Sequence, residues 1–143
     1  CDLNDTAWFD RIDASGGAIF FAAGVFYYFL REQVRALVQR MAAAFPGGVL
    51  VFDAANEKAV RLMLKTWIRD AKIKNVGAYF AVADAKAELG PWDSRLQISS
   101  RGYMLGYHDL KDPSVSGFFR FLARVGDRSM NMQIVRIGFG GEI

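Results

Sequence analysis

Two short, continuously apolar runs, each followed by a segment with helical periodicity, constrain the fold more than any other feature of this sequence. The first run is AIFFAAGV at residues 18–25, and the second is VLVF at residues 49–52. A short apolar run bounded by turn residues is typical of a strand that is covered on both faces, as in parallel sheets. The order strand, helix, strand, helix predicts a parallel sheet with right-handed crossovers.

The segments that follow the two runs have the apolar spacing of amphipathic helices. Apolar residues recur at helical intervals over residues 30–45, and the sequence Pro46-Gly47-Gly48 ends that pattern. A second helix is predicted after Asn56, whose side-chain oxygen can cap it by accepting a hydrogen bond from the first turn.

The second half of the sequence predicts two longer strands with a helix between them. The strands are expected over residues 96–107 and 130–139, and helices over 84–89 and 114–125. The inward face of the later helix is expected to consist of Phe118, Phe121, Leu122 and Val125. Because these strands are not joined by two full crossovers, we expect them to pair in antiparallel fashion. The predicted fold class is α/β, with a mostly parallel sheet and an antiparallel edge.

Composition and charge exclude several classes of protein. Hydrophobic residues make up 52% of the 143 residues, which provides material for a core and excludes intrinsic disorder. No apolar run reaches the roughly 18 residues of a membrane span, and the polar start is unlike a signal peptide. We therefore expect a cytoplasmic protein with no membrane partner. One cysteine and one histidine exclude an internal disulfide and a multi-histidine or cysteine-cluster metal site.

The positive charge is too weak to indicate a nucleic-acid partner. The formal net charge is only +3. The basic residues at helical spacing are Arg61, Lys65, Arg69 and Lys72. We interpret them as a solvated helix face, since a nucleic-acid patch usually has a stronger charge excess and interleaved aromatic residues.

The ends of the two apolar runs are where a ligand is expected, because open parallel sheets bind ligands beyond the carboxyl ends of their strands. Small residues at the first end would let a ligand approach the backbone, although tight packing of strand against helix explains them equally well. These small residues are Ala22, Ala23 and Gly24. The nearest polar groups are Tyr27, Tyr28 and Asp53, and Asp53 is more simply interpreted as a helix-capping carboxylate.

Several short segments, spread over nearly the whole chain, together resemble one enzyme family. They are Asp5-Thr6-Ala7-Trp8, IFFAAGVFYYF at 19–29, LREQVRALVQRMAAAFPGG at 30–48, VLVFDAAN at 49–56 and WD at 92–93. In their order and spacing these segments resemble class I S-adenosylmethionine-dependent methyltransferases, in particular the subgroup related to leucine carboxyl methyltransferases and polyketide O-methyltransferases. Members of that subgroup have a D-x-x-W element, a strand ending in an A-E-G-x-x-x-Y-like run, and F-P-G-G before a strand ending in F-D.

The resemblance implies that this chain is the C-terminal half of a Rossmann-like methyltransferase sheet. That family has seven strands in the order 3-2-1-4-5-7-6, with strand 7 antiparallel, and the four predicted strands correspond to strands 4-5-7-6. The family's glycine-rich cofactor loop follows strand 1, so residues 1–143 are expected to form a single partial domain that lacks it. The first methionine is Met41, which agrees with the expectation of a processed or longer protein.

The resemblance also implies S-adenosylmethionine as cofactor and methyl transfer to an oxygen, hydroxyl or carboxylate, of a small molecule. The implied cofactor contacts are Asp2 and Leu3 at the adenine, and Ala22, Ala23 and Gly24 toward the sulfonium. Because the family often has Glu where this chain has Ala23, no acid–base role is carried over to that position. Proximity and alignment can supply much of the rate of such a transfer, so no catalytic residue is singled out. The candidates for the acceptor pocket are Tyr28, Trp67, Tyr103 and Tyr107, each of which could equally belong to the core.

The expected partial sheet has a consequence for partners. The strand at residues 18–25 is central in the family's complete sheet, so here its edge is expected to carry unpaired amides and carbonyls. Such an edge pairs readily with another strand, and we expect either a homodimer through it or a separate N-terminal half. The alternative function is a non-catalytic α/β interaction module that binds a partner through this edge or through the basic helix at 57–72. A nucleic-acid-modifying enzyme is a weaker alternative, since no N-P-P-Y-like tetrad follows the strand at 18–25.

Overall fold

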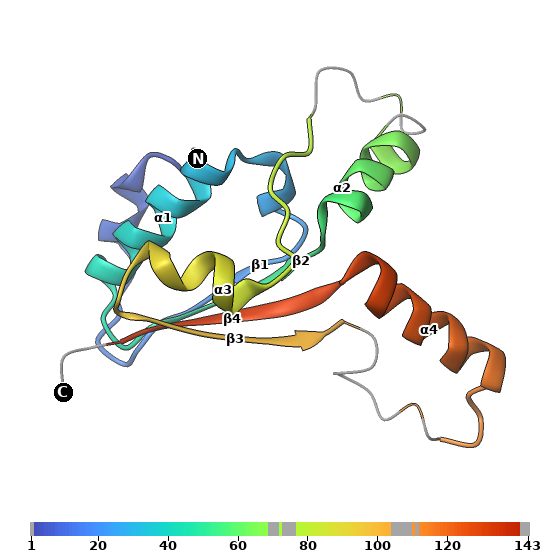
Figure 1. Ribbon diagram of the computed structural model, residues 1–143. Helices are drawn as coiled ribbons and strands as arrows, with labels where there is room; N and C mark the ends of the chain where they lie inside the picture. Colours follow the sequence, from blue (N-terminus) through green and yellow to red (C-terminus); the bar gives the residue numbers. More distant parts are fainter. Residues whose placement is uncertain (1, 69–71, 73–76, 104–109, 111, 141–143) are drawn as a thin grey trace.

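A single four-stranded sheet organises the computed structural model, which describes residues 2–68, 72, 77–103, 110 and 112–140. Its strands are β1 (Ile19–Ala22), β2 (Val49–Ala54), β3 (Leu96–Gly102) and β4 (Gln133–Phe139). They lie in the order β1-β2-β4-β3 (Figure 1). β1 and β2 are parallel, whereas β4 is antiparallel to both of its neighbours. The predicted α/β fold class, strand order and antiparallel strand are confirmed.

Within the described residues, four α-helices connect the strands. They are α1 (Arg31–Ala44), α2 (Glu57–Met63), α3 (Ala85–Leu89) and α4 (Gly117–Met130). Single turns of 3-10 helix occupy Phe26–Tyr28 and Gly90–Trp92, a longer one occupies Thr6–Arg11, and a π-helix at Leu64–Ile68 continues α2. The predicted cap of the second helix is confirmed, because the Asn56 side chain accepts a hydrogen bond from Ala59 N at 3.0 Å.

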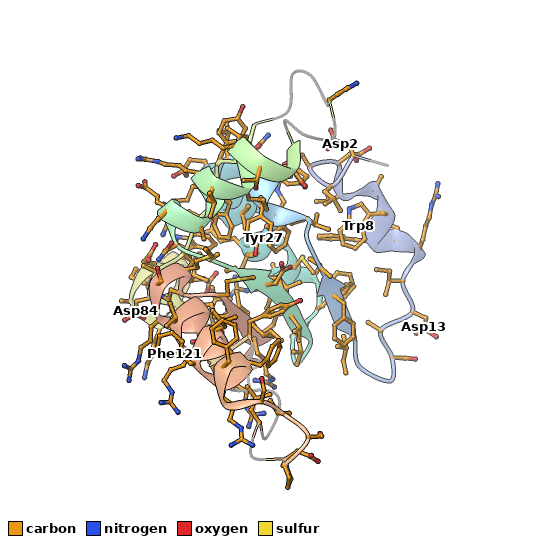
Figure 2. The ribbon with its side chains drawn as sticks, turned by 90° about the vertical axis from the view of Figure 1, so that its right-hand side faces the viewer. Asp2, Trp8, Asp13, Tyr27, Asp84 and Phe121 are labelled. Atoms are coloured by element: carbon orange, nitrogen blue, oxygen red, sulfur yellow. The ribbon has the colours of Figure 1, made fainter. Side chains whose placement is uncertain are left out.

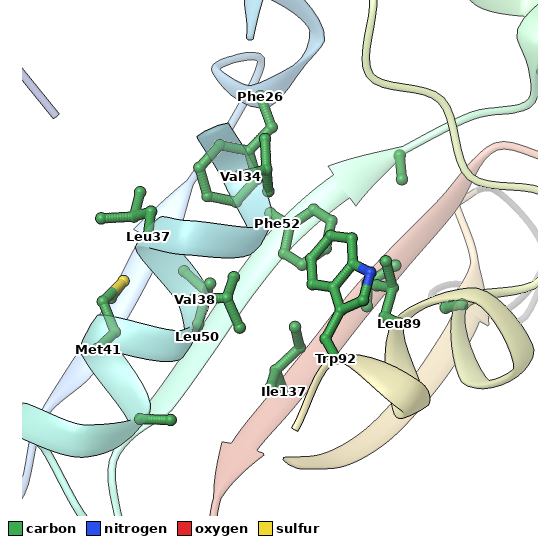
Figure 3. Packing of buried hydrophobic residues seen from close by; sticks show 14 of the residues in the cluster. Phe26, Val34, Leu37, Val38, Met41, Leu50, Phe52, Leu89, Trp92 and Ile137 are labelled. Carbon is green, nitrogen blue, oxygen red and sulfur yellow. The ribbon is translucent and has the colours of Figure 1, made fainter. Parts of the chain in front are cut away.

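The main hydrophobic core lies between α1, α3 and one face of the sheet (Figure 3). Leu50 and Phe52 of β2 and Ile137 of β4 point to this face and are at most 2% exposed. Val38 of α1 and Trp92 cover them from the helical side. Full burial of an aliphatic or aromatic side chain of this kind contributes roughly 1.5–3 kcal/mol, so this layer is the main source of the fold's stability.

The opposite face of the sheet is open over β1. Ile19 and Phe21 alternate with the core-facing residues and are 66% and 76% exposed. The expectation that this strand is covered on both faces is therefore wrong for the described residues. The reason is topological: both crossovers from β1 onward advance in the same direction across the sheet, and right-handed connections then place their helices on the same face.

Helix α4 also differs from the prediction. Its apolar residues Phe118, Phe121, Leu122 and Val125, expected to point inward, are 71%, 59%, 47% and 44% exposed. Ala123 is the only fully buried residue of this helix. In Figure 1 the helix projects from the start of β4 instead of lying along the sheet. The amphipathic pattern is real, but no described element covers the apolar side.

Candidate functional site

A cavity of about 570 Å³ lies where the carboxyl ends of β1 and β2 meet the start of β4. The segments after β1 and at the end of β2 contribute Gly24, Tyr27, Tyr28, Asp53 and Ala55. Helix α2 and its π-helical continuation contribute Ala59, Val60, Leu62, Met63 and Thr66. The segment after β3 contributes Tyr103, and the segment from the end of α4 to the start of β4 contributes Met130 and Met132. This is the position that the topology of a parallel sheet predicts for a ligand.

A hydrogen bond joins the two strand ends at the floor of the cavity. Gly24 N donates to Asp53 Oδ1 over 2.6 Å. Gly24 has a φ of +64°, in the left-handed region that favours glycine, so this residue turns the chain sharply out of β1. Asp53 thereby fixes the loop after β1 and does not cap α2, whose cap is Asn56. The helix-capping interpretation of Asp53 is therefore wrong.

Tyr27 places a buried hydroxyl beside the Asp53 carboxylate. The residue is 6% exposed and lies between α2 and the strand ends (Figure 2). Its backbone carbonyl accepts a hydrogen bond from Tyr79 N at 2.7 Å, which anchors the turn that carries it. Burial first, and then the charge and hydrogen bond of Asp53, raise the pKa of Tyr27 far above its usual value. Tyr27 is therefore a neutral hydroxyl throughout the physiological pH range.

The other walls of the cavity are mostly apolar and held by backbone contacts. Asn56 N donates to Met130 O at 3.0 Å, and Asn56 Nδ2 donates to Ser129 O at 3.0 Å. These bonds tie the start of α2 to the end of α4 and bring Met130 to the cavity. Tyr103 N donates to Met132 O at 2.9 Å, which fixes the opposite wall. The hydroxyl of Thr66 donates to Leu62 O at 2.9 Å and is thus satisfied within its own helix.

The structure brings together some of the residues predicted from the sequence. Gly24, Tyr28 and Tyr103 line one cavity with Asp53. Ala22 and Ala23 directly precede that wall without lining it; Ala22 is half-buried in β1 and Ala23 is exposed.

Other predicted residues lie elsewhere or outside the described structure. Asp2 is exposed and accepts a hydrogen bond from Asn4 N at 2.9 Å, while Leu3 packs against the main core. Neither of these two residues lines the cavity. The backbone of Trp67 belongs to the π-helix, but its side chain and all of Tyr107 are outside the described residues.

The three methionines of the cavity were not identified as site residues from the sequence. Met63 falls in the helix predicted after Asn56, and Met130 falls in the strand predicted over residues 130–139. That strand begins later, because α4 continues to Met130 and is closed by Asn131 in the left-handed conformation, with a φ of +46°. A helix end and a strand end meet at this wall, and only the tertiary structure places their side chains together.

A second, more open cavity of about 930 Å³ lies on the outer side of α2. Its cationic residues are Arg31, Lys58, Arg61 and Lys65. Two carboxylates neutralise part of this charge, with Arg31–Glu88 at 3.0 Å and Arg61–Glu57 at 3.1 Å. The Arg61 side chain is 75% exposed. Arg61 and Lys65, the first two residues of the predicted basic stripe, thus lie on a solvated helix face. Arg69 is outside the described residues.

The described residues lack two kinds of feature. They contain no helix long and apolar enough to cross a membrane. Within the same part of the chain, no group of three or more His, Cys, Asp and Glu residues is arranged to hold a metal ion.

Comparison with known proteins gives a structural likeness without a sequence family. No protein-family profile matches the sequence, and no curated protein matches it. Among solved structures, a DUF574 family protein from Streptomyces avermitilis is similar, with a TM-score of 0.63 and 12% sequence identity. The likeness covers 96% of this chain and 53% of that structure, so the chain spans about half the length of its structural neighbour. At this identity the likeness shows the fold alone: a mixed α/β sheet with flanking helices, as in part of a Rossmann-like domain.

Proposed function

We propose that this chain is the acceptor-binding half of an S-adenosylmethionine-dependent methyltransferase that acts on an oxygen, hydroxyl or carboxylate, of a small molecule. The observation that carries the proposal is the cavity at the carboxyl ends of β1 and β2, in a sheet whose order and antiparallel β4 match the expected methyltransferase half. Its volume, about 570 Å³, is within the range of about 300–1,000 Å³ typical of small-molecule sites. A cytoplasmic location, without nucleic-acid or membrane partners, belongs to the same proposal.

The residues of the cavity fit the reactive end of the proposed cofactor. A sulfonium is a cation, and this cavity offers it the Asp53 carboxylate and the aromatic rings of Tyr28 and Tyr103. Open space lies beside Gly24, where an added Cβ would meet nothing within 4 Å. When bound, S-adenosylmethionine supplies a methyl group on a good leaving group. The contribution of this chain is to orient the acceptor oxygen and, where the acceptor is a hydroxyl, to take up the proton that it loses.

The remaining contacts of the cofactor are expected from elsewhere. Asp2 and Leu3, which the resemblance assigns to the adenine, lie in the segment before the Thr6–Arg11 helix, and neither lines the cavity. The chain also spans only 53% of the similar solved structure. We therefore include in the proposal an N-terminal half that carries the glycine-rich loop and packs against the open part of the sheet.

The first test is a calorimetric titration of S-adenosylhomocysteine into the 143-residue chain. Saturable binding in the micromolar range would support the proposal and show that the chain, alone or as an oligomer, retains a usable site. The same titration with Asp53→Ala is expected to weaken binding, because this change removes the acceptor of the Gly24 N hydrogen bond and releases the loop after β1. Absence of binding by the chain, followed by absence of binding when an upstream half is supplied, would refute the proposal.

A second candidate function is a non-catalytic interaction module. The observation that favours it is the exposed apolar surface formed by Ile19 and Phe21 of β1, on a strand that pairs only with β2 among the described residues. An open strand edge with apolar neighbours is a common site of association. A chain that binds another polypeptide tightly but shows no affinity for S-adenosylhomocysteine in any assembly would establish this function instead.

A further inference from the structure

The geometry points to a hydroxyl, and not a carboxylate, as the group that the ligand of the 570 Å³ cavity presents to Asp53. We infer that this ligand is a largely apolar molecule with an alcoholic or phenolic hydroxyl at one end. The inference rests on the proposed function, in which this cavity takes the methyl acceptor, and it decides between the two acceptor classes left open there.

The charge of the lining is the first argument. Asp53 is the one carboxylate among the described lining residues, and none of those residues is a lysine, arginine or histidine. A ligand carboxylate placed against Asp53 would meet a like charge in a partly buried site whose described lining supplies no compensating cation. Like charges at such separations repel strongly where water is largely excluded. The cationic residues near α2 line the other cavity, on the outer side of the helix.

The hydrogen-bonding capacity of Asp53 is the second argument. A carboxylate has two oxygens and about four acceptor sites. Gly24 N occupies one site on Oδ1, and the buried Tyr27 hydroxyl is the second neighbour of this carboxylate. The remaining acceptor sites of Asp53, which lines the cavity, can take a hydrogen bond from a donor on the ligand. A hydroxyl donates a hydrogen bond and can leave its proton on the carboxylate as its oxygen forms a new bond, whereas an ionised carboxyl group can only accept.

The rest of the lining indicates an apolar body for the ligand. Met63, Met130 and Met132 contribute flexible thioether side chains, which adapt to irregular apolar shapes and make favourable contacts with aromatic rings. Ala55 and Ala59 keep the space between them open, and both are buried. A flat aromatic or alicyclic skeleton with one hydroxyl would satisfy both the thioether walls and the single acidic group.

The experiment compares 2-naphthol with 2-naphthoate, which share a skeleton and differ in the group presented. The chain is labelled with ¹³C at the methyl groups of its five methionines, and each ligand is titrated while the methyl resonances are recorded. Met63, Met130 and Met132 line the cavity, whereas Met41 is 2% exposed in the main core and serves as an internal control. At neutral pH we expect 2-naphthol to shift the three cavity methyls with an affinity about tenfold or more above that of 2-naphthoate.

Two variants separate the role of Asp53 from general effects on the fold. Asp53→Asn removes the charge but keeps an amide oxygen that can accept from Gly24 N. The preference for 2-naphthol over 2-naphthoate is therefore expected to fall to about twofold or less. Asp10→Asn makes the same change at an exposed position outside the cavity lining and is expected to leave the preference unchanged. If Asp53→Asn does not fold, the comparison of the two ligands on the unmodified chain still decides.

Equal affinity for the two ligands, tighter binding of 2-naphthoate, or no shift of the cavity methyls with either ligand would overturn the inference. Its failure is distinguishable from failure of the proposed function, because S-adenosylhomocysteine binding is measured separately. Binding of S-adenosylhomocysteine without a preference for 2-naphthol would leave the methyltransferase proposal standing. A preference for 2-naphthol in a chain that never binds S-adenosylhomocysteine would establish the hydroxyl site without the transfer.

Discussion

Gly24 and Asp53 form a hydrogen bond between the ends of two parallel strands, and the backbone of Gly24 is shaped for it. With a φ of +64°, the residue occupies a region that side chains of L-residues rarely adopt, although an added Cβ would meet no atom within 4 Å. A substitution here therefore acts through backbone strain and not through a clash. This makes the position a clean test of whether the loop after β1 is held as described.

We expect Gly24→Ala to lower the free energy of unfolding by about 1–2 kcal/mol, the cost of placing a Cβ in the left-handed region. The matched control is Gly16→Ala, at a glycine where an added Cβ also meets nothing and φ is not positive. That control is expected to change the free energy by no more than about 0.5 kcal/mol. Urea denaturation of the two variants measures the difference, and an equal loss in both would contradict the described turn.

Tyr27 predicts how stability depends on alkaline pH. Its pKa is raised in the folded state by burial and by Asp53, so the folded protein disfavours the tyrosinate that the unfolded chain forms readily. This contribution to stability is fully present below the pKa of an unfolded tyrosine, about 10, and is progressively lost above it. The free energy of unfolding should therefore fall less between pH 9 and 11 for Tyr27→Phe than for the unmodified chain. The difference between the two falls is the contribution of the one tyrosine that the variant lacks. Identical pH profiles for the two proteins would show that this hydroxyl titrates normally.

At the scale of elements, the two amphipathic helices α1 and α4 have opposite environments. The apolar side of α1 packs on the sheet, whereas the aromatic side of α4 is exposed. Sequence periodicity is the same signal in both cases, since it reports which side of a helix is apolar and not what covers it. The stability of the chain should therefore depend on the first packing surface and scarcely on the second.

We expect Leu50→Ala to cost about 2–5 kcal/mol, because Leu50 is 2% exposed beneath α1 and its truncation leaves a cavity. Phe121→Ser, at a residue 59% exposed on α4, is expected to change stability by about 0.5 kcal/mol or less. Chemical denaturation of both variants is the measurement. A large loss for Phe121→Ser would show that another part of the protein covers α4 in solution.

Much of the fold could be predicted from the sequence because local patterns decide it. The two apolar runs, the stop at Pro46-Gly47-Gly48 and the Asn56 cap each depend on a few adjacent residues, and the structure agrees with them. The antiparallel placement of the last strand followed from the lack of room for a second crossover. Which faces of the strands and helices are covered could not be predicted, because the covering elements are distant in sequence. Phe21 is the example: its run of apolar neighbours is compatible with one covered face or with two.

The candidate site was predictable in part for the same reason. Gly24, Tyr28 and Asp53 follow strand ends, so topology alone brings them to one edge. The role of Asp53 was not predictable because a carboxylate just before a helix can bond either to that helix or to a residue distant in sequence, and here it bonds to Gly24 N. Met130 and Met132 carry no local signal for a site, since their convergence depends on the meeting of α4 with β4.

At the scale of the whole molecule, the sheet has one covered face and one face that is apolar over β1 and polar toward β3. Ile19 and Phe21 are exposed at the first end, while Arg101 and Arg136 are exposed at the other. The polar part of this face is suited to contact with water, whereas the exposed apolar part is suited to contact with another protein surface. We expect the apolar part to be covered in solution by a second copy or by the N-terminal half of the proposed enzyme.

Sedimentation velocity measures this association. The 143-residue chain alone should show concentration-dependent dimerisation, and Phe21→Lys should shift the equilibrium toward monomer by placing a charge in the apolar surface. Arg101→Lys, which keeps the charge on the polar part of the same sheet face, is the control and should leave the equilibrium unchanged. A monodisperse monomer at high concentration, with no second polypeptide present, would contradict the expectation.

The position of β4 sets the order in which this protein can fold during synthesis. β4 is the last of the described strands along the chain, yet it lies between β2 and β3 and supplies the only described pairing of β3. Until residues 133–139 leave the ribosome, β3 has no strand beside it and β2 is paired on one side only. The nascent chain therefore exposes an unpaired β3 and the aromatic side of α4 until β4 has been synthesised. This interval of exposure is when a chaperone would be needed most.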